Sequence, residues 1–478
     1  MLSTGSWAEQ RYAHLTILHT NDTHSHLLPF SYPSTVIVEG KKIDLPFHEN
    51  VGGIARRATI IKHMNKQDGV LVLDAGDVID GSPFSIEFAG EADFAALNAT
   101  GYEAMVTGNH EYSNTLENFN KRLHEARLPV LGANVFKSDG TPMLIPYVIM
   151  TEGGLKIAVL GLVTPNDYTA VKEANLTIKD PVEVAREWVP KLRAMADVVI
   201  LLTHIGHDED KALAAGVPGI DAIIGGHSHT RVPKPVLVKS GASADAFSLG
   251  GTVVAQDFQW GSELGEVDLL FHKGNSGWSL MSFDGKLIPI TSDVPEDPSV
   301  RAIVEKYHKK IAAKYDEVIG EATDDFIAEA PTNMVTDVLR ETYNADFAMQ
   351  NYGGVRTDLV KGPITMGDIA CLFPFNNWVQ TFQATGMQIK GILLKSRPSV
   401  SGIKYQIEGG KLVSAEIGGK PVDDSRVYTG VTHVFFAEHE IPKGIVMNDG
   451  KALVRDLIIK WIKQKKTISP DNEYRAQF

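Results

Sequence analysis

The sequence of 478 residues contains a single cysteine, no long apolar run and no excess of basic residues. Cys371 stands alone, so an intrachain disulfide and a thiolate metal cluster are excluded, and any metal must be held by His, Asp, Glu or Asn. No stretch approaches the ~20 apolar residues of a membrane-spanning helix, so we expect no membrane span. Lys and Arg number 46 against 59 Asp and Glu, and the net charge of −13 disfavours a nucleic acid polymer as partner.

The length and the N-terminal composition limit the organisation and the compartment. The chain is longer than one hydrophobic core usually grows, so we expect two domains. Residues 1–14 lack the apolar run of a secretory signal. We therefore expect a periplasmic or secreted protein if a signal peptide was removed before this sequence, and a cytoplasmic protein otherwise. These features do not indicate an oligomeric state.

The first half of the chain repeats a pattern in which a short apolar run stops at polar residues. Runs of four or five aliphatic residues bounded by Gly and polar clusters are typical of buried strands. Amphipathic stretches at 55–65 and 182–195 predict helices between them. Strands that alternate with helices indicate an α/β layered domain, in which ligands gather at the carboxyl ends of the strands. The four runs are 15–18, 70–73, 198–202 and 220–224.

The polar residues that follow these runs are of the types that hold divalent metals. Taken singly, each has an ordinary interpretation, such as a surface turn for Asp22 and His24, a helix N-cap for Asp77, or a structural histidine. Their shared position after buried strands favours a two-metal site instead, because a carboxylate can bridge ions about 3.5–4 Å apart. Histidines at strand ends add imidazole nitrogen ligands. The candidate ligands are Asp22, His24, Asp77, Asn109, His204, His227 and His229.

These motifs, in the order DTH, GD, GNHE, TH and GHSH, resemble those of the calcineurin-like metallophosphoesterases. The resemblance implies a layered α/β/β/α metallophosphoesterase sandwich over residues 1–292. Further along the chain, Asn351-Tyr352-Gly353-Gly354-Val355-Arg356 and Phe373-Pro374-Phe375 resemble the C-terminal domain of the 5′-nucleotidases. This implies a second, smaller α+β domain over residues 319–478 that binds substrate. Helical spacing and dense charge predict a linker helix within 293–318.

The resemblance also assigns roles to individual residues. It implies a first metal held by Asp22, His24, Asp77 and His229. It implies a second metal held by Asp77, Asn109, His204 and His227. His110 matches the histidine that stabilises the transition state, and Asp77 shares the catalytic centre as the bridging ligand. The implied substrate-binding residues are Asn351, Gly353, Arg356, Phe375 and Phe435.

This sequence departs from the family pattern in three places. The family has an Asp three residues after the catalytic histidine, whereas this chain has Ser113, so the orientation of His110 must come from another residue. AEHEIPKG replaces the family's glycine-rich ending after Phe435, and FIAEAPT stands where an arginine is usual. We therefore expect phosphate and ribose to be recognised differently from an ordinary 5′-nucleotidase.

The sequence therefore predicts a dimetal hydrolase that releases phosphate from nucleotides. Water activated between two divalent ions would attack the phosphate. The metals can be Zn, Mn, Co or Fe, because His, Asp and Asn ligands accept each of them. Alternatives of the same build are a 2′,3′-cyclic-nucleotide phosphodiesterase with 3′-nucleotidase activity, a UDP-sugar hydrolase and a thiosulfate-ester hydrolase. A weakly catalytic binding protein is a further alternative, suggested by Ser113. The expected partner is a small anionic substrate, most simply a nucleotide.

Overall fold

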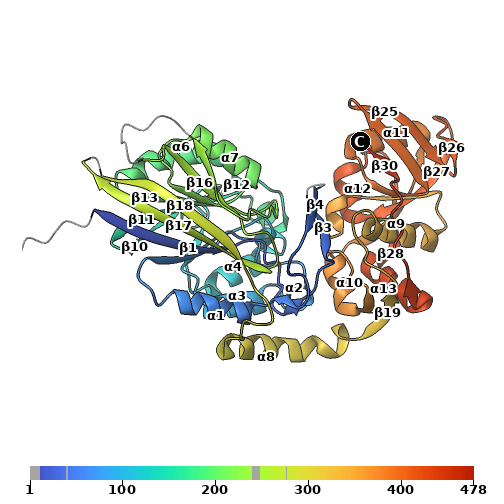
Figure 1. Cartoon of the computed structure of the whole chain (residues 1–478). Helices are drawn as coiled ribbons and strands as arrows, with labels where there is room; N and C mark the ends of the chain where they lie inside the picture. The colour runs from blue at the N-terminus through green and yellow to red at the C-terminus, as the bar shows by residue number, and fades with distance from the viewer. Residues whose placement is uncertain (1–10, 39–40, 240–247, 276) are drawn as a thin grey trace, which may run out of the picture. The chain divides into compact units, whose positions relative to one another are not determined.

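The computed structural model describes residues 11–38, 41–239, 248–275 and 277–478 (Figure 1). The chain divides into two compact units. The N-terminal unit comprises residues 1–30, 49–80 and 84–308, and the C-terminal unit comprises residues 31–48, 81–83 and 309–478. Most of segment 1–14, which lacks the apolar run of a secretory signal, lies outside the described residues.

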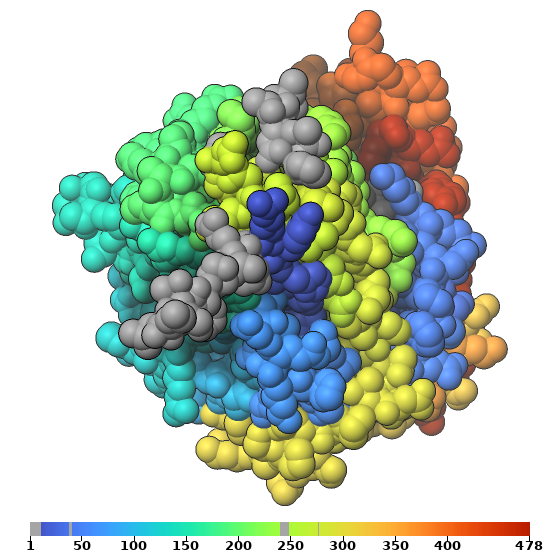
Figure 2. All heavy atoms as spheres, turned by 60° about the vertical axis from the view of Figure 1, so that its left-hand side comes forward, coloured from blue at the N-terminus to red at the C-terminus, as the bar shows by residue number. Residues whose placement is uncertain are grey.

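The N-terminal unit is built on two six-stranded sheets, each parallel in its centre. The first has the order β18 (Gly277–Pro289), β17 (Glu263–Gly274), β1 (Tyr12–Thr20), β6 (Val70–Asp74), β7 (Ala104–Val106) and β8 (Val130–Leu131). The second has the order β10 (Tyr147–Glu152), β11 (Leu155–Val163), β13 (Val198–His204), β14 (Ala222–Ile224), β16 (Gly251–Ala255) and β15 (Val236–Lys239). Figure 2 shows one face of this unit, where the dark blue start of β1 lies beside the yellow hairpin of β17 and β18.

Both faces of the central strands are buried, which explains their continuous apolar sequences. Leu71 and Leu73 of β6 point into the core between the two sheets, together with Ile200 and Leu202 of β13. Their neighbours along each strand point the opposite way, because side chains alternate in a strand. Val72, for example, packs in the outer cluster of the first sheet.

Helices cover the two outer faces. The first sheet packs against α1 (Ile54–Met64) and α3 (Glu91–Thr100), and the second against α6 (Pro181–Arg193) and α7 (His207–Gly216). Helix α6 begins where its sequence predicts, because the Asp180 side chain accepts a hydrogen bond from the backbone N–H of Glu183 at 2.9 Å and Pro181 follows. The order helix, sheet, sheet, helix confirms the predicted α/β/β/α sandwich.

The C-terminal unit is α+β, as predicted. Its largest sheet has the order β23 (Ser399–Ser401), β20 (Phe347–Gln350), β27 (Val427–His433), β22 (Trp378–Thr385) and β28 (Met447–Leu453). One face packs against α9 (Ala330–Tyr343), α10 (Met366–Leu372) and α13 (Val454–Lys465), and the other against α11 (Gly386–Ser396) and α12 (Val434–Glu440). Capping boxes at Thr365 and Thr385 fix the starts of α10 and α11.

The segment expected to link two domains contains helix α8 (Pro298–Tyr315). The division between the two compact units falls inside this helix, between His308 and Lys309. None of the helices in the described ranges combines the length and the apolar character that a membrane crossing requires.

Candidate metal centre

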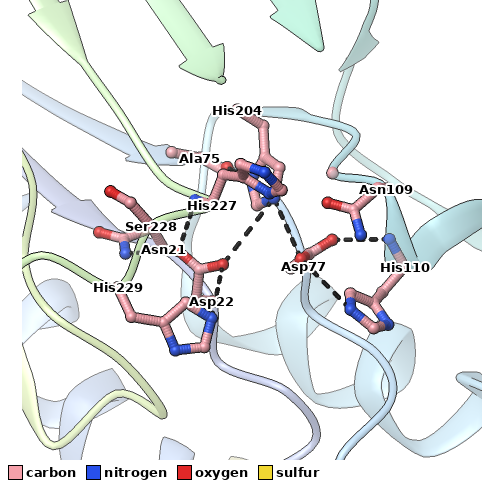
Figure 3. Close-up of polar contacts among 12 residues, drawn as sticks. Asn21, Asp22, Ala75, Asp77, Asn109, His110, His204, His227, Ser228 and His229 are labelled. Carbon is pink, nitrogen blue, oxygen red and sulfur yellow. Dashed lines mark hydrogen bonds and ion pairs between the residues drawn. The ribbon is translucent and has the colours of Figure 1, made fainter. Parts of the chain in front are cut away.

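The candidate ligands follow strands of both sheets of the N-terminal unit. Asp22, Asp77 and Asn109 come within three residues of the ends of β1, β6 and β7 in the first sheet. His204 ends β13, and His227 comes three residues after β14 in the second sheet. The carboxyl ends of parallel strands meet at one edge of a sheet, so the loops of the two sheets converge (Figure 3).

Five of the seven candidate ligands have a left-handed backbone, with φ of 49° at Asp22, 45° at His24, 54° at Asp77, 79° at His227 and 53° at His229. This conformation is costly for residues other than glycine, and it concentrates at functional sites. The loops that carry it support each other. The backbone N–H of Asp22 donates to the Gly76 carbonyl at 2.9 Å, and that of His24 donates to the Asp77 carbonyl at 3.0 Å.

Two glycines allow the loops to approach this closely. A Cβ on Gly108 would lie 2.1 Å from Asp77 Oδ1, and a Cβ on Gly226 would lie 2.8 Å from His204 Nδ1. Real Cβ atoms essentially never come nearer than 3.0 Å to another heavy atom. The glycines of GNHE and GGHSH therefore keep space for the side chains beside them.

One group of ligand atoms gathers around Asp22, His24 and His229, all within 4.8 Å of one another. His24 Nε2 lies 3.2 Å from His229 Nε2, and His229 Nε2 lies 3.3 Å from Asp22 Oδ1. Two imidazole nitrogens and a carboxylate oxygen that face one point form a donor set suited to a divalent cation.

Asp77 belongs to two further groups of this kind, one with His204 and His227 and one with His24 and His110. Its Oδ2 lies 3.0 Å from His204 Nε2 and 3.8 Å from His24 Nε2. In Figure 3 the carboxylates of Asp22 and Asp77 point toward each other, with His204 between them. The Asp77 carboxylate is thus shared by two of these groups of candidate ligand atoms.

Buried polar atoms without a hydrogen-bond partner mark the same point. Asp22 Oδ1, Asn109 Oδ1 and His204 Nε2 are each buried with no hydrogen-bond partner among the described residues, and their contacts with charged groups lie within the ligand cluster itself. The amide nitrogen of Asn109 is directed away, because it donates to the Tyr168 hydroxyl at 3.2 Å and leaves the oxygen free. Unpaired buried polar atoms are costly unless an ion or water completes them. The donors present therefore fit divalent cations.

The electrostatics of the cluster favour positive charge. Burial alone raises the pKa of Asp22, but His229 and His204 outweigh it and hold that pKa below its usual value. Burial lowers the pKa of His204, yet the carboxylates of Asp77 and Asp22 outweigh burial and raise it to about 10. Two buried carboxylates therefore attract cations to this point.

Outer contacts orient the imidazole rings. His24 Nδ1 lies 2.7 Å from the Asp80 carbonyl, and His204 Nδ1 lies 2.7 Å from the Ala75 carbonyl. His229 Nδ1 contacts the side-chain oxygen of Gln259. A carbonyl accepts only, so each Nδ1 carries a hydrogen, and each Nε2 is the nitrogen directed toward the centre.

Two residues near the centre were not identified from the sequence. The Glu111 carboxylate accepts hydrogen bonds from the backbone N–H groups of Asp77 at 3.0 Å, Val78 at 2.9 Å and Gly108 at 2.6 Å, and so joins two ligand loops. The position of Glu111 inside the GNHE motif was the feature of the sequence that could have identified it. The carboxylate of Asp80 lies 3.1 Å from Nδ1 of His110. Asp80 follows Asp77 in DAGDVID, where nothing in the sequence distinguishes it from a turn residue.

The predicted substrate residues lie in the C-terminal unit. Asn351 caps the 3₁₀ helix η2 (Tyr352–Gly354), and its buried Oδ1 has no hydrogen-bond partner among the described residues. Gly353 is exposed, while Arg356 and Phe375 are half-buried. Phe435 lies in α12 with its ring stacked on His439 at 4.3 Å. The roles of these residues stay predictions.

Comparison with known proteins identifies both parts of the chain. Residues 15–231 match the family described as calcineurin-like phosphoesterase, and residues 318–441 match the 5′-nucleotidase C-terminal domain. A 5′-nucleotidase of Vibrio cholerae is 30% identical over 87% of this chain and 83% of its own length. A 5′-nucleotidase precursor of Thermus thermophilus has a similar structure, with a TM-score of 0.84, 27% identity and coverage of 97% of this chain and 98% of that one.

The sulfate thiohydrolase SoxB of Thermus thermophilus shares the fold, with a TM-score of 0.81 at 20% identity over 98% of this chain and 97% of that one. At this identity the likeness concerns the fold alone. The assignment to a family rests on the two family matches and on the relative in Vibrio cholerae. This chain belongs to the 5′-nucleotidase family and combines a calcineurin-like metallophosphoesterase domain with a 5′-nucleotidase C-terminal domain.

Proposed function

We propose that this chain is a phosphomonoesterase that releases phosphate from nucleotides at a centre of two divalent cations. One observation carries the proposal. Asp77 lies in two groups of candidate ligand atoms at once, beside buried polar atoms that have no hydrogen-bond partner among the described residues. Family membership supports the reaction type, a metal-dependent hydrolysis of a phosphoric ester.

The ligand assignment is part of this proposal. Asp22, His24, Asp77 and His229 would hold the first ion, and Asp77, Asn109, His204 and His227 would hold the second. Two bound divalent cations would activate a water molecule and neutralise charge on the phosphoryl group. Only two of the seven ligands are carboxylates, so the protein cancels about two of the four positive charges and the centre keeps its attraction for an anion.

His110 supplies a hydrogen bond to the phosphoryl oxygens in this proposal. Its Nε2 lies 4.0 Å from Asp77 Oδ2, and its ring packs edge-on against His24 with centroids 4.9 Å apart, so it borders the ligand cluster. A donor fixed beside the reacting group stabilises the charge that spreads over those oxygens in the transition state.

The C-terminal unit selects the substrate in this proposal. The match of residues 318–441 to the 5′-nucleotidase C-terminal domain supports the assignment. The exposed backbone of Gly353 and the unpaired Asn351 Oδ1 are available for hydrogen bonds, and Arg356 suits a phosphate oxygen. Phe375 and Phe435 would stack on a base. We propose the domain limits as 1–292, with a linker helix within 293–318, and 319–478.

A second candidate is the hydrolysis of a thiosulfate ester, which the fold likeness to the sulfate thiohydrolase favours. Within the family, a cyclic-nucleotide phosphodiesterase and a UDP-sugar hydrolase need the same centre. The proposed phosphomonoesterase releases phosphate and a thiosulfate-ester hydrolase releases sulfate, so measurement of the two products separates the two candidates.

A hydrolysis screen tests the proposal. Wild-type protein is loaded with Zn²⁺, Mn²⁺, Co²⁺ or Fe²⁺ and assayed on 5′-, 3′- and 2′,3′-cyclic nucleotides, nucleotide sugars and a thiosulfate ester. We expect phosphate release from a nucleotide, at least about 100-fold lower in Asp77→Asn and unchanged in the exposed control Asp68→Asn. Release of sulfate alone, or no release with any metal, contradicts the proposal.

A further inference from the structure

The imidazole of His110 is held from the loop that follows β6. Its Nδ1 lies 3.1 Å from Oδ2 of Asp80, whereas the pattern places an aspartate at position 113, where this chain has serine. Ser113 instead ends the 3₁₀ helix η1 (His110–Tyr112), and its Oγ accepts a hydrogen bond from the Asn114 side chain at 3.5 Å. The carboxylate next to His110 therefore comes from the Asp77 loop.

The carboxylate of Asp80 is itself fixed. Asp80 has a left-handed backbone with φ of 62°, and its N–H donates to Ser85 Oγ at 2.8 Å. The Ser85 hydroxyl donates in turn to Asp80 Oδ1 at 3.2 Å, which leaves Oδ2 for His110. A carboxylate held at one oxygen presents the other in a defined direction, and such support positions a functional histidine.

Asp80 contacts two site histidines through different groups. Its backbone carbonyl accepts from Nδ1 of His24 at 2.7 Å, and its side chain accepts from Nδ1 of His110. A change of the side chain therefore leaves the contact to the candidate ligand His24 in place. This separation makes the role of the carboxylate testable without removing a metal contact.

The surroundings of His110 strengthen this contact. The His110 side chain is 6% exposed and that of Asp80 is 18% exposed, so water screens the pair little. The ring packs edge-on against His24 and Tyr168, with centroids 4.9 Å and 5.5 Å away. These rings confine the imidazole, and a bond at Nδ1 decides that Nε2 is the nitrogen turned to the centre.

We propose that Asp80 is the positioning residue for His110, supplying from another loop the carboxylate that the family pattern places at position 113. The inference rests on the proposed function, because it concerns the same reaction. It explains how the chain keeps an oriented histidine with Ser113 after it, and it argues against the weakly catalytic binding protein that Ser113 suggested.

A double-mutant cycle tests the inference. Asp80→Asn keeps the size and tolerates the left-handed backbone. We expect it to lower kcat about 10- to 100-fold with KM within about twofold, the usual effect of losing such a partner. In a His110→Ala background the same change costs nothing further, because its effect passes through the imidazole. Asp139→Asn, an exposed carboxylate of the same unit, is the matched control.

Transfer of the carboxylate gives an independent test. Ser113→Asp in the Asp80→Asn background places the acid where the family pattern has it, and we expect kcat to recover at least about tenfold. A purely structural role for Asp80 predicts no recovery, because Ser113 lies on a different loop. Metal content and thermal unfolding are measured for each variant, and we expect both to match wild type.

A spectroscopic readout does not depend on turnover. In zinc-loaded wild-type protein labelled with ¹⁵N-histidine, we expect an Nδ1–H signal that vanishes in His110→Ala and shifts in Asp80→Asn. A wild-type His110 protonated at Nε2 alone would overturn the inference, as would an active wild type with an equally active Asp80→Asn. An equal loss of kcat in the His110→Ala background would overturn it too. Failure of the proposed function is distinct, since wild type itself would then release no phosphate.

Discussion

Gly108 lies so close to Asp77 that one added methyl group tests the geometry of the metal centre. In Gly108→Ala the new Cβ would lie 2.1 Å from Asp77 Oδ1 and 2.6 Å from Asp77 Cγ. Because real Cβ contacts begin near 3.0 Å, the Oδ1 atom must retreat by about 0.9 Å, and the Asp77 backbone nitrogen, 2.6 Å from the new Cβ, must shift as well. Gly108 has no left-handed backbone, so alanine itself fits the local conformation.

A retreat of this size is large on the scale of metal coordination, where ligand distances hold within about 0.2 Å. We expect Gly108→Ala to lower metal affinity and to reduce kcat/KM at least about 100-fold, the order of loss for a 1 Å displacement of a reacting group. Overpacking should also cost about 1–3 kcal/mol of unfolding free energy. Metal titration by calorimetry, steady-state hydrolysis and urea unfolding measure the three effects.

Gly216→Ala is the matched control. Gly216 lies in the same unit, and a Cβ there would meet only the Arg186 side chain, at 3.7 Å. We expect this control to bind metal and turn over as wild type does. A Gly108→Ala protein that binds two ions with wild-type affinity and keeps wild-type kcat/KM would refute the placement of Asp77 against Gly108.

Three further predictions concern charge, pH and the substrate loop. Asn109→Asp adds a negative charge among the ligands, so metal should bind more tightly and inhibition by phosphate should weaken about tenfold or more, as inhibition kinetics would show. Burial raises the pKa of Asp93 to about 7, so the folded state binds a proton that the unfolded state releases, and stability falls as pH rises from about 4 to 7. The free energy of unfolding of Asp93→Asn, measured in urea, should therefore exceed that of wild type by about 2–4 kcal/mol at pH 8 and nearly equal it at pH 4. Arg455 donates hydrogen bonds to the Phe373 and Pro374 carbonyls at 3.4 and 2.8 Å, next to Phe375. Arg455→Lys should therefore raise KM for a nucleotide about 3- to 10-fold at constant kcat. The exposed Arg426→Lys is the control.

Much of the fold could be predicted because the central strands are buried on both faces. The apolar runs at 70–73 and 198–202 correspond to β6 and β13, and the stretches at 55–65 and 182–195 correspond to α1 and α6. The approach of the candidate ligand side chains also followed from their place after parallel strands. That approach depends on sheet geometry, which the pattern of apolar runs followed by polar residues can predict.

The contacts that orient the site could not be predicted, for a physical reason. The backbone carbonyls of Ala75 and Asp80 accept hydrogen bonds from His204 and His24. Every residue has a backbone carbonyl, so the residue type does not reveal such a contact. The link between Asp80 and His110 spans 30 positions, and Asp80 makes it from a left-handed turn. Long-range loop geometry of this kind depends on the packed structure.

The proposed function depends on Asp77 bridging two cations that are held by residues from both sheets. Anomalous diffraction from crystals loaded with Zn²⁺ or Mn²⁺, together with metal analysis in solution, tests it directly. We expect two ions per chain, about 3.5–4 Å apart, with Asp77 in contact with both. A single ion, or two ions of which Asp77 contacts neither, would contradict it.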